Sequence, residues 1–113
     1  MSKQLWELIE SFEWVKDHDY ERIGEICKNL PKDDFKKLED FIYKKINLLH
    51  KKFDKDWLGN PGIDCGDDSW GDLLAEVVGR GENFYKSITA DKLRDMVNND
   101  DYEECFTYCL HID

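Results

Sequence analysis

Apolar side chains recur at steps of three and four residues along most of this chain, which is the spacing of one face of an α-helix. The first stripe predicts an amphipathic helix over residues 3–16, with Ser2 as its cap. A break in the period leads into a second helix, which has Asp19 as its N-cap and ends at Pro31. The longest stripe predicts about five turns of helix over residues 35–53, with a lysine-rich opposite face.

The stretch from Asn60 to Tyr85 organises the rest of the prediction. It opens with a turn-forming Asn-Pro-Gly, passes through a loop that collects aspartates, and becomes an apolar helix over residues 69–79. Asp68 or Ser69 is expected to cap this helix, because carboxylate and hydroxyl oxygens accept the free N–H groups of a first turn. Its apolar side chains make it the helix on which the others pack: Trp70, Leu73, Leu74, Val77 and Val78.

Three further helices are predicted after the central one. The first follows it directly, the second covers residues 90–97 with Thr89 as its N-cap, and the last covers residues 102–110. No segment alternates with period two, so no strand is predicted. We therefore predict an all-α fold: a single domain over residues 1–113, built as a bundle of about six to seven helices around the apolar helix 69–79.

The composition is that of a folded protein. Hydrophobic residues make up 41% and aromatic residues 13% of the chain, which excludes an intrinsically disordered sequence despite 37% charged residues. The first residues include acids and no uninterrupted apolar run, so no secretory signal is expected. No stretch approaches the roughly 18 apolar residues of a membrane span. We expect a cytoplasmic chain that does not associate with membranes.

The acidic residues are distributed unevenly. Residues 1–57 contain 12 Lys+Arg and 13 Asp+Glu, whereas residues 58–113 contain 4 Lys+Arg and 13 Asp+Glu, so nearly all of the net charge of −10 lies in the second half. A negative field of this kind repels nucleic acid and anionic membrane, and it attracts a basic partner. An acidic surface also keeps a protein soluble, which is the simpler explanation of the same charge.

The aspartate-rich loop raises the question of a calcium site. On an EF-hand pattern that starts at Asp64, the side chains of Asp68 and Asp72 fall at ligand positions. However, Ser69 stands where the loop needs its turn glycine, and Ala75 stands where it needs a bidentate acid. Helix capping therefore explains these aspartates better than calcium does.

Four cysteines raise the question of zinc. The candidate ligands are Cys105, Cys109 and His111, with Cys65 or His50. Structural zinc sites use closer cysteine pairs, and without a secretory signal free thiols are expected. Cys27 and the 105/109 pair fall at apolar helix positions, where a buried cysteine packs as a small hydrophobe. We expect no metal and no other cofactor, with zinc binding as the alternative.

Nothing in the sequence favours catalysis. None of the three histidines neighbours a glycine-rich elbow or a ligand motif. The glycine-containing turns at residues 59–62 and 79–81 lack the lysine and Ser/Thr neighbour of a phosphate-binding loop. We therefore expect a protein that is not an enzyme.

Several short motifs resemble a family of small bacterial helical domains that has no assigned chemistry. They are a Leu-Pro-x-acid-acid step at residues 30–34, an Asp-Asp-x-aromatic helix entry at residues 67–70, and an apolar-apolar-Gly-x-Gly turn at residues 77–81, followed by Tyr85. The resemblance covers roughly residues 1–97 and implies a fold and a bacterial setting. The chain departs from the family in its long Trp57–Asp64 loop and in Val77-Val78, where the family more often has Trp-Leu-Ile. More loosely, the chain is similar to small acidic immunity proteins that neutralise bacterial toxins.

Charge, size and this looser resemblance lead to one functional hypothesis. We expect an immunity protein of a polymorphic toxin or contact-dependent growth inhibition system, a monomer when free, which binds a basic, nuclease-type toxin domain and no nucleic acid directly. The expected partner-binding acids are Asp64, Asp67, Asp68, Asp72, Glu76 and Glu82. Trp57 and Trp70 flank the acidic loop and would supply apolar anchors if exposed. The alternatives are a phage-encoded anti-CRISPR or other nucleic-acid mimic, and a small enzyme or metal-binding domain.

Overall fold

The structure of the chain is a computed structural model that describes residues 2–53, 67–99, 101–102 and 106–110. The predicted all-α fold is confirmed, and the described residues form no strand. The helices, in chain order, are α1 (Ser2–Ser11), α2 (Trp14–Asp17), α3 (Tyr20–Lys28), α4 (Lys32–Lys52), α6 (Asp67–Gly79), α7 (Glu82–Ser87), α8 (Ala90–Asn98) and the 3₁₀-helix η1 (Phe106–Leu110). No helix in these ranges is long and apolar enough to cross a membrane.

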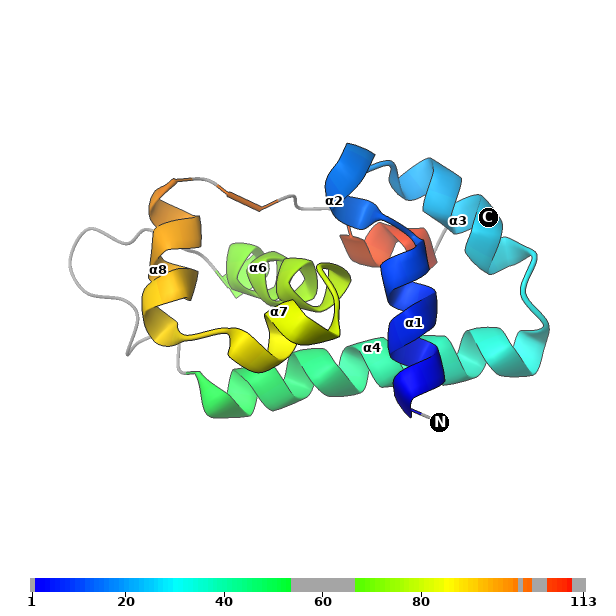
Figure 1. Cartoon of the computed structure of the whole chain (residues 1–113), viewed down its shortest axis with the longest axis horizontal. Helices are drawn as coiled ribbons and strands as arrows, with labels where there is room; N and C mark the ends of the chain where they lie inside the picture. Colours follow the sequence, from blue (N-terminus) through cyan, green and yellow to red (C-terminus); the bar gives the residue numbers. More distant parts are fainter. Residues whose placement is uncertain (1, 54–66, 100, 103–105, 111–113) are drawn as a thin grey trace.

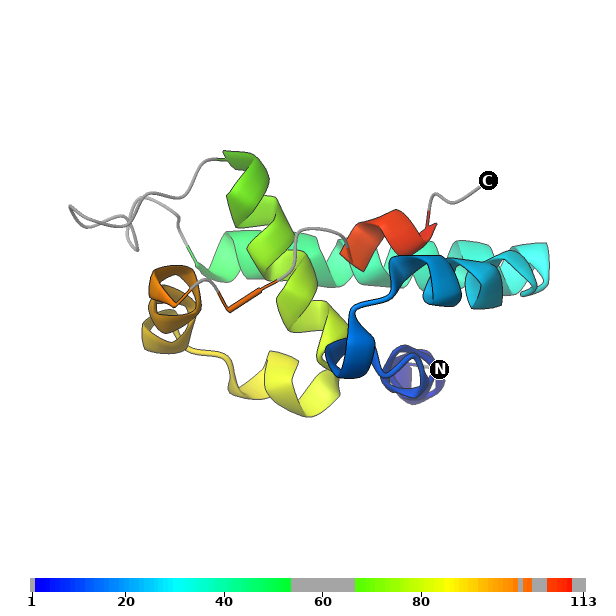
Figure 2. The same cartoon turned by 90° about the horizontal axis from the view of Figure 1, so that it is seen from above.

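The long helix α4 forms the base on which the other helices lie (Figure 1). Helix α6 crosses α4, and α7 and α8 lie on the side of α6 that faces the end of α4 (Figure 2). Helices α1 and α3 and the 3₁₀-helix η1 lie towards the beginning of α4 (Figure 1). Helix α6 contacts α4, α7, α8 and η1, so the predicted central position of this helix is confirmed.

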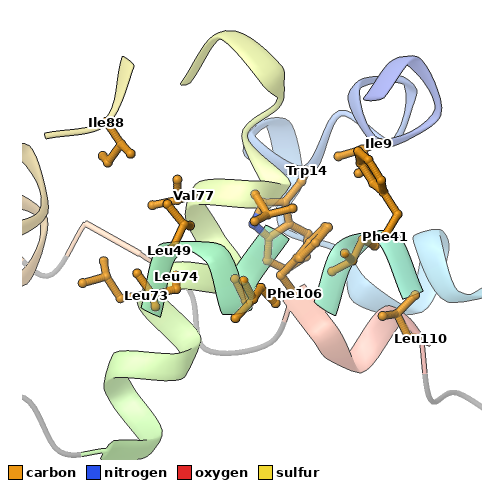
Figure 3. Close-up of a cluster of buried hydrophobic side chains, with 14 of the residues drawn as sticks. Ile9, Trp14, Phe41, Leu49, Leu73, Leu74, Val77, Ile88, Phe106 and Leu110 are labelled. Atoms are coloured by element: carbon orange, nitrogen blue, oxygen red, sulfur yellow. The ribbon is translucent and has the colours of Figure 1, made fainter. Parts of the chain in front are cut away.

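Most of helix α6 is enclosed by the rest of the molecule. Every residue from Leu73 to Gly79 is buried, so this part of the helix has no solvent-facing side. Figure 3 shows its apolar side chains beside those of α4, α2 and η1. The core side chains labelled there are Ile9, Trp14, Phe41, Leu49, Leu73, Leu74, Val77, Ile88, Phe106 and Leu110. One apolar core therefore joins both ends of the chain.

The predicted helix over residues 3–16 is wrong, because the structure divides it. Helix α1 ends at Ser11, Glu13 adopts a left-handed conformation (φ 50°, ψ 46°), and α2 begins at Trp14. Residues 12 and 14 would lie about 200° apart on one helix, so both could not face the same core. The break buries both Phe12 and Trp14 and turns Val15 outward, where it is 53% exposed.

The other helix boundaries depend on local capping. Asp19 accepts hydrogen bonds from the backbone N–H groups of residues 21 and 22, and Thr89 accepts one from residue 92, so both predicted N-caps are confirmed. Helix α6 begins at Asp67, two residues before the predicted start. The predicted last helix is wrong at its beginning: Tyr102 lies in a bend, and the Asp101 carbonyl accepts a hydrogen bond from Arg80 (2.8 Å).

Candidate functional site

For four of the eight residues predicted to bind a partner, the structure describes no side chain. Asp64 and Trp57 lie outside the described residues. Asp67 and Asp68 occupy the first turn of α6, and the structure describes only their backbone. Asp72 is half-buried in the next turn of the same helix. The predicted site is thus described in part, along the beginning of α6.

Glu82 is a half-buried acid at the start of α7. Its Oε2 lies 3.2 Å from Nζ of Lys86, one helical turn away. Its backbone N–H donates to Oε2 of Glu10 (3.1 Å), which fixes the first turn of α7 against α1. The residue before it, Gly81, has a backbone φ of 104°, which residues other than glycine rarely adopt. Glu82 therefore follows a turn whose backbone conformation requires glycine. Its carboxylate is in part exposed to solvent.

Trp70 is not an exposed anchor, which corrects the prediction. Its side chain is 5% exposed and lies between α6 and α4. The indole Nε1 donates a hydrogen bond to Nδ1 of His50 (3.2 Å), so the polar edge of the ring also has a partner within the protein. Because both its apolar surface and its N–H group are used in this way, Trp70 has nothing left to offer a second protein.

Glu76 is not a surface acid, which is the larger correction. Its side chain is completely buried. One carboxylate oxygen, Oε1, accepts a hydrogen bond from Nε1 of Trp14 (2.6 Å), and the other, Oε2, accepts one from Nε of Arg80 (2.7 Å). Nε2 of His18 lies 3.9 Å from Oε2. A buried carboxylate is costly unless it is paired and hydrogen-bonded, and here both oxygens have donors.

Arg80 extends this network to the segment that follows α8. Its side chain is 13% exposed, and Nη2 donates to both the carbonyl oxygen (2.8 Å) and Oδ1 (3.1 Å) of Asp101. The guanidinium also lies 5.0 Å from the ring centroid of Phe84. Burial by itself lowers the pKa of Arg80, but the hydrogen bonds to Glu76 and Asp101 outweigh it, so the pKa is raised and the charge is kept.

The buried network holds the fold together and offers little to a substrate. Through Glu76, helix α6 is tied to α2, and through Arg80 it is tied to the segment after α8. A carboxylate beside a histidine is a common acid–base pair, but each oxygen of Glu76 already accepts a strong hydrogen bond, and the side chain has no contact with solvent. We assign the network to structure.

A signal in the sequence marks Glu76 as a buried acid. It has apolar neighbours in α6 on both sides, at positions 73–75 and 77–78. If this part of the helix is buried around its whole circumference, Glu76, the one acid within it, must be buried as well. Arg80, four residues later, stands where it can pair with that acid on the same helix. Trp14 and His18 come from a distant part of the chain, and no local pattern links them to residue 76.

The metal and thiol predictions are tested only in part. Among the described residues, no three His, Cys, Asp or Glu side chains lie close enough to hold a metal ion. Cys27 is buried, and burial raises the pKa of its thiol to about 11, as suits a cysteine that packs as an apolar side chain. Cys65, Cys105 and His111 lie outside the described residues, and for Cys109 only the backbone in η1 is described.

Basic side chains in the second half of the chain are largely paired with acids of the same half. The pairs are Arg80 with Glu76 and Asp101, Lys86 with Glu82, and Arg94 with Asp91. Asp91 and Asp101 remain 89% and 52% exposed in these pairs. Among the described residues, these three bases are therefore engaged by acids of the same half of the chain.

Comparison of the chain with protein families, with curated proteins and with solved structures finds no match.

Proposed function

We propose that this chain is a bacterial, cytoplasmic immunity protein that binds a basic, nuclease-type toxin domain through an acidic surface and performs no chemistry. The observation that carries the proposal is the separation of charge along the chain, with a balance of −9 in residues 58–113 against −1 in residues 1–57. The ion pairs of Arg80, Lys86 and Arg94 with nearby acids support the proposal, because a paired cation repels a basic partner less than an unpaired one does. A positive cleft evolved to hold nucleic acid is attracted to such a surface.

The contact residues follow from burial as well as from charge. Glu76 and Trp70 are removed from the proposed surface because both are buried. Asp72 and Glu82 stay in it, together with the predicted acids Asp64, Asp67 and Asp68. The exposed acids of α8, Asp91 and Asp95, are proposed as additional contacts. Inhibition then results from occupation of the toxin's substrate cleft, and Glu76 acts only by holding α6 in place.

The test screens toxin domains encoded by genes that neighbour the gene of this chain, in a growth-rescue assay and in stopped-flow binding with the purified toxin domain. The variant carries Asp67→Asn, Asp68→Asn and Asp72→Asn. We expect its association rate at low salt to fall about tenfold or more, because charge steering acts mainly on association. The wild-type rate should fall with added salt, and circular dichroism should show that the variant is still folded at the temperature of the assay.

The matched control carries Glu7→Gln, Glu21→Gln and Glu25→Gln, which remove the same charge from exposed positions of α1 and α3. It should rescue growth as the wild type does. If the triple aspartate variant keeps full potency, or if both variants lose it equally, the acidic surface of the second half is not the toxin-binding site. Inhibition of a duplex-binding phage-defence nuclease, with no effect on any neighbouring toxin, would assign the acids to nucleic-acid mimicry.

A further inference from the structure

Helices α1 and α3, the 3₁₀-helix η1 and the beginning of α4 lie towards the same end of the molecule (Figures 1 and 2). Two neighbouring hollows lie between these elements. One has a volume of about 200 Å³ and lies between α3, α4 and η1; its apolar wall consists of Cys27, Leu30, Phe35 and Leu110. The other has a volume of about 230 Å³ and lies between α1 and α4, with Leu5, Leu8 and Leu30 as its apolar wall. Leu30 belongs to both, so the two hollows adjoin at the connection between α3 and α4. We call this surface the Leu30 groove.

The edge of the Leu30 groove is basic, although the chain as a whole is strongly acidic. Lys28 and Lys32 line the first hollow and Lys37 lines the second, against a single acid, Asp34. All three lysines are exposed. None of them takes part in an ion pair with another described residue, in contrast to Lys36, which lies 3.2 Å from Asp40. These ammonium groups therefore have no ion-pair partner within the part of the chain that the structure describes.

The size of each hollow favours a protein segment over a small molecule. Small-molecule sites usually measure about 300–1,000 Å³ and enclose most of their ligand. Each hollow here is smaller than that. Two adjoining hollows of this kind match two apolar side chains from one face of a helix laid across the surface, a common mode of peptide recognition. The lysines then favour a segment in which acidic residues flank those apolar side chains.

We propose that the Leu30 groove binds an acidic amphipathic segment of another protein, which places two apolar side chains in the hollows and carboxylates against Lys28, Lys32 and Lys37. Charge complementarity decides the occupant: a basic segment is repelled by the three lysines, and a neutral apolar one leaves them unpaired. This binding surface has the opposite charge preference from the toxin-binding surface proposed above and does not depend on it.

The experiment selects binders from a phage-displayed library of random 15-residue peptides on the full chain. The selected peptides are then synthesised with a fluorescent label, and their affinity is measured by anisotropy. We expect them to carry net negative charge and two apolar residues at helical spacing. A variant with Lys28→Glu, Lys32→Glu and Lys37→Glu should bind them about tenfold more weakly or worse, with the difference shrinking at high salt.

The matched control reverses three exposed lysines in the second half of α4, with Lys44→Glu, Lys51→Glu and Lys52→Glu, and should bind the peptides nearly as well as the wild type. A further variant, Leu30→Glu, tests the apolar wall and should also lose binding; the lysine variants decide the question if it does not fold. Absence of enriched peptides, enrichment of basic ones, or equal binding to both lysine variants would overturn the proposal. So would a dimer in sedimentation that only the Lys28/Lys32/Lys37 variant dissolves, because the groove would then belong to a second copy of this chain.

Discussion

Replacement of Glu76 is the sharpest test of the structural role assigned to it. Glu76→Ala removes the acceptors of Trp14 Nε1 (2.6 Å) and Arg80 Nε (2.7 Å) and leaves a guanidinium that is only 13% exposed without its main partner. Removal of one member of a buried ion pair costs about 3–5 kcal/mol. In a chain of 113 residues this corresponds to a fall of about 10 °C or more in the melting temperature. Such a loss is a large part of the roughly 5–15 kcal/mol that stabilises a typical domain.

Two milder variants separate charge from packing. Glu76→Gln keeps the volume but turns an amide NH₂ towards one of the two donors, so we expect a loss of about 1–3 kcal/mol. The same substitution at Glu82, whose side chain is 32% exposed, should change stability by less than about 0.5 kcal/mol. Urea unfolding at neutral pH measures the stability loss of each variant. An unchanged slope of free energy against urea concentration shows that the folded and unfolded states are as compact as those of the wild type.

The reasoning would be refuted by one simple result. If Glu76→Gln and Glu82→Gln have the same unfolding midpoint as the wild type, the buried carboxylate does not stabilise the contact between α2 and α6. A complementary check replaces Glu76 and Arg80 together with methionine and Trp14 with phenylalanine. Because an apolar set of similar size avoids the desolvation of the charges, this variant should recover most of the stability that Glu76→Ala loses.

Three further predictions concern packing, reactivity and pH. Gly79→Ala should cost about 1–3 kcal/mol in urea unfolding, because the added Cβ would lie 2.9 Å from Cδ1 of the buried Phe106 ring; a loss within error would show that η1 shifts freely. Cys27, in a variant whose other cysteines are serine, should react with Ellman's reagent at pH 8 only after unfolding, because burial raises its thiol pKa to about 11; rapid labelling of the native chain would contradict this. The pKa of Asp17, which its hydrogen bonds with Arg22 hold below the usual 3.8, should return towards that value in Arg22→Gln. Since the folded pKa is the lower one, the stability that this pair contributes is present above the unfolded pKa and is lost as pH falls through the folded one, which carboxyl NMR shifts and acid unfolding can follow together.

Local features of the sequence were enough to predict the helices that have clear periodicity and caps. Helix α4 was predicted because its apolar residues repeat over its full length, and α3 and α8 because Asp19 and Thr89 supply side-chain oxygens at their first turns. Boundaries failed where a distant contact decides them. The break at Glu13 exists because Phe12 and Trp14 both enter the core, and residues 12 and 14 of a single helix would point in nearly opposite directions.

The candidate site shows the same division more strongly. Asp72 and Glu82 are half-buried, whereas Glu76 and Trp70, close to them in the chain, are buried. Periodicity assigns a residue to a face of its own helix, but it does not say what lies opposite that face. The hydrogen-bond partner of Glu76 is Trp14 of α2, and that of Trp70 is His50 of α4. Both buried side chains thus pair with residues of other helices.

The sequence by itself determined the fold class, the central place of the apolar helix and the excess of acid in the second half, because these depend on composition and on spacing between near neighbours. Only the tertiary structure decided which acids belong to the surface, and it brought Leu5, Leu8, Leu30 and Phe35 from three segments into one groove edged by lysines. The physical reason is that burial and pairing are properties of the space between helices. That space is defined only when the whole chain has packed.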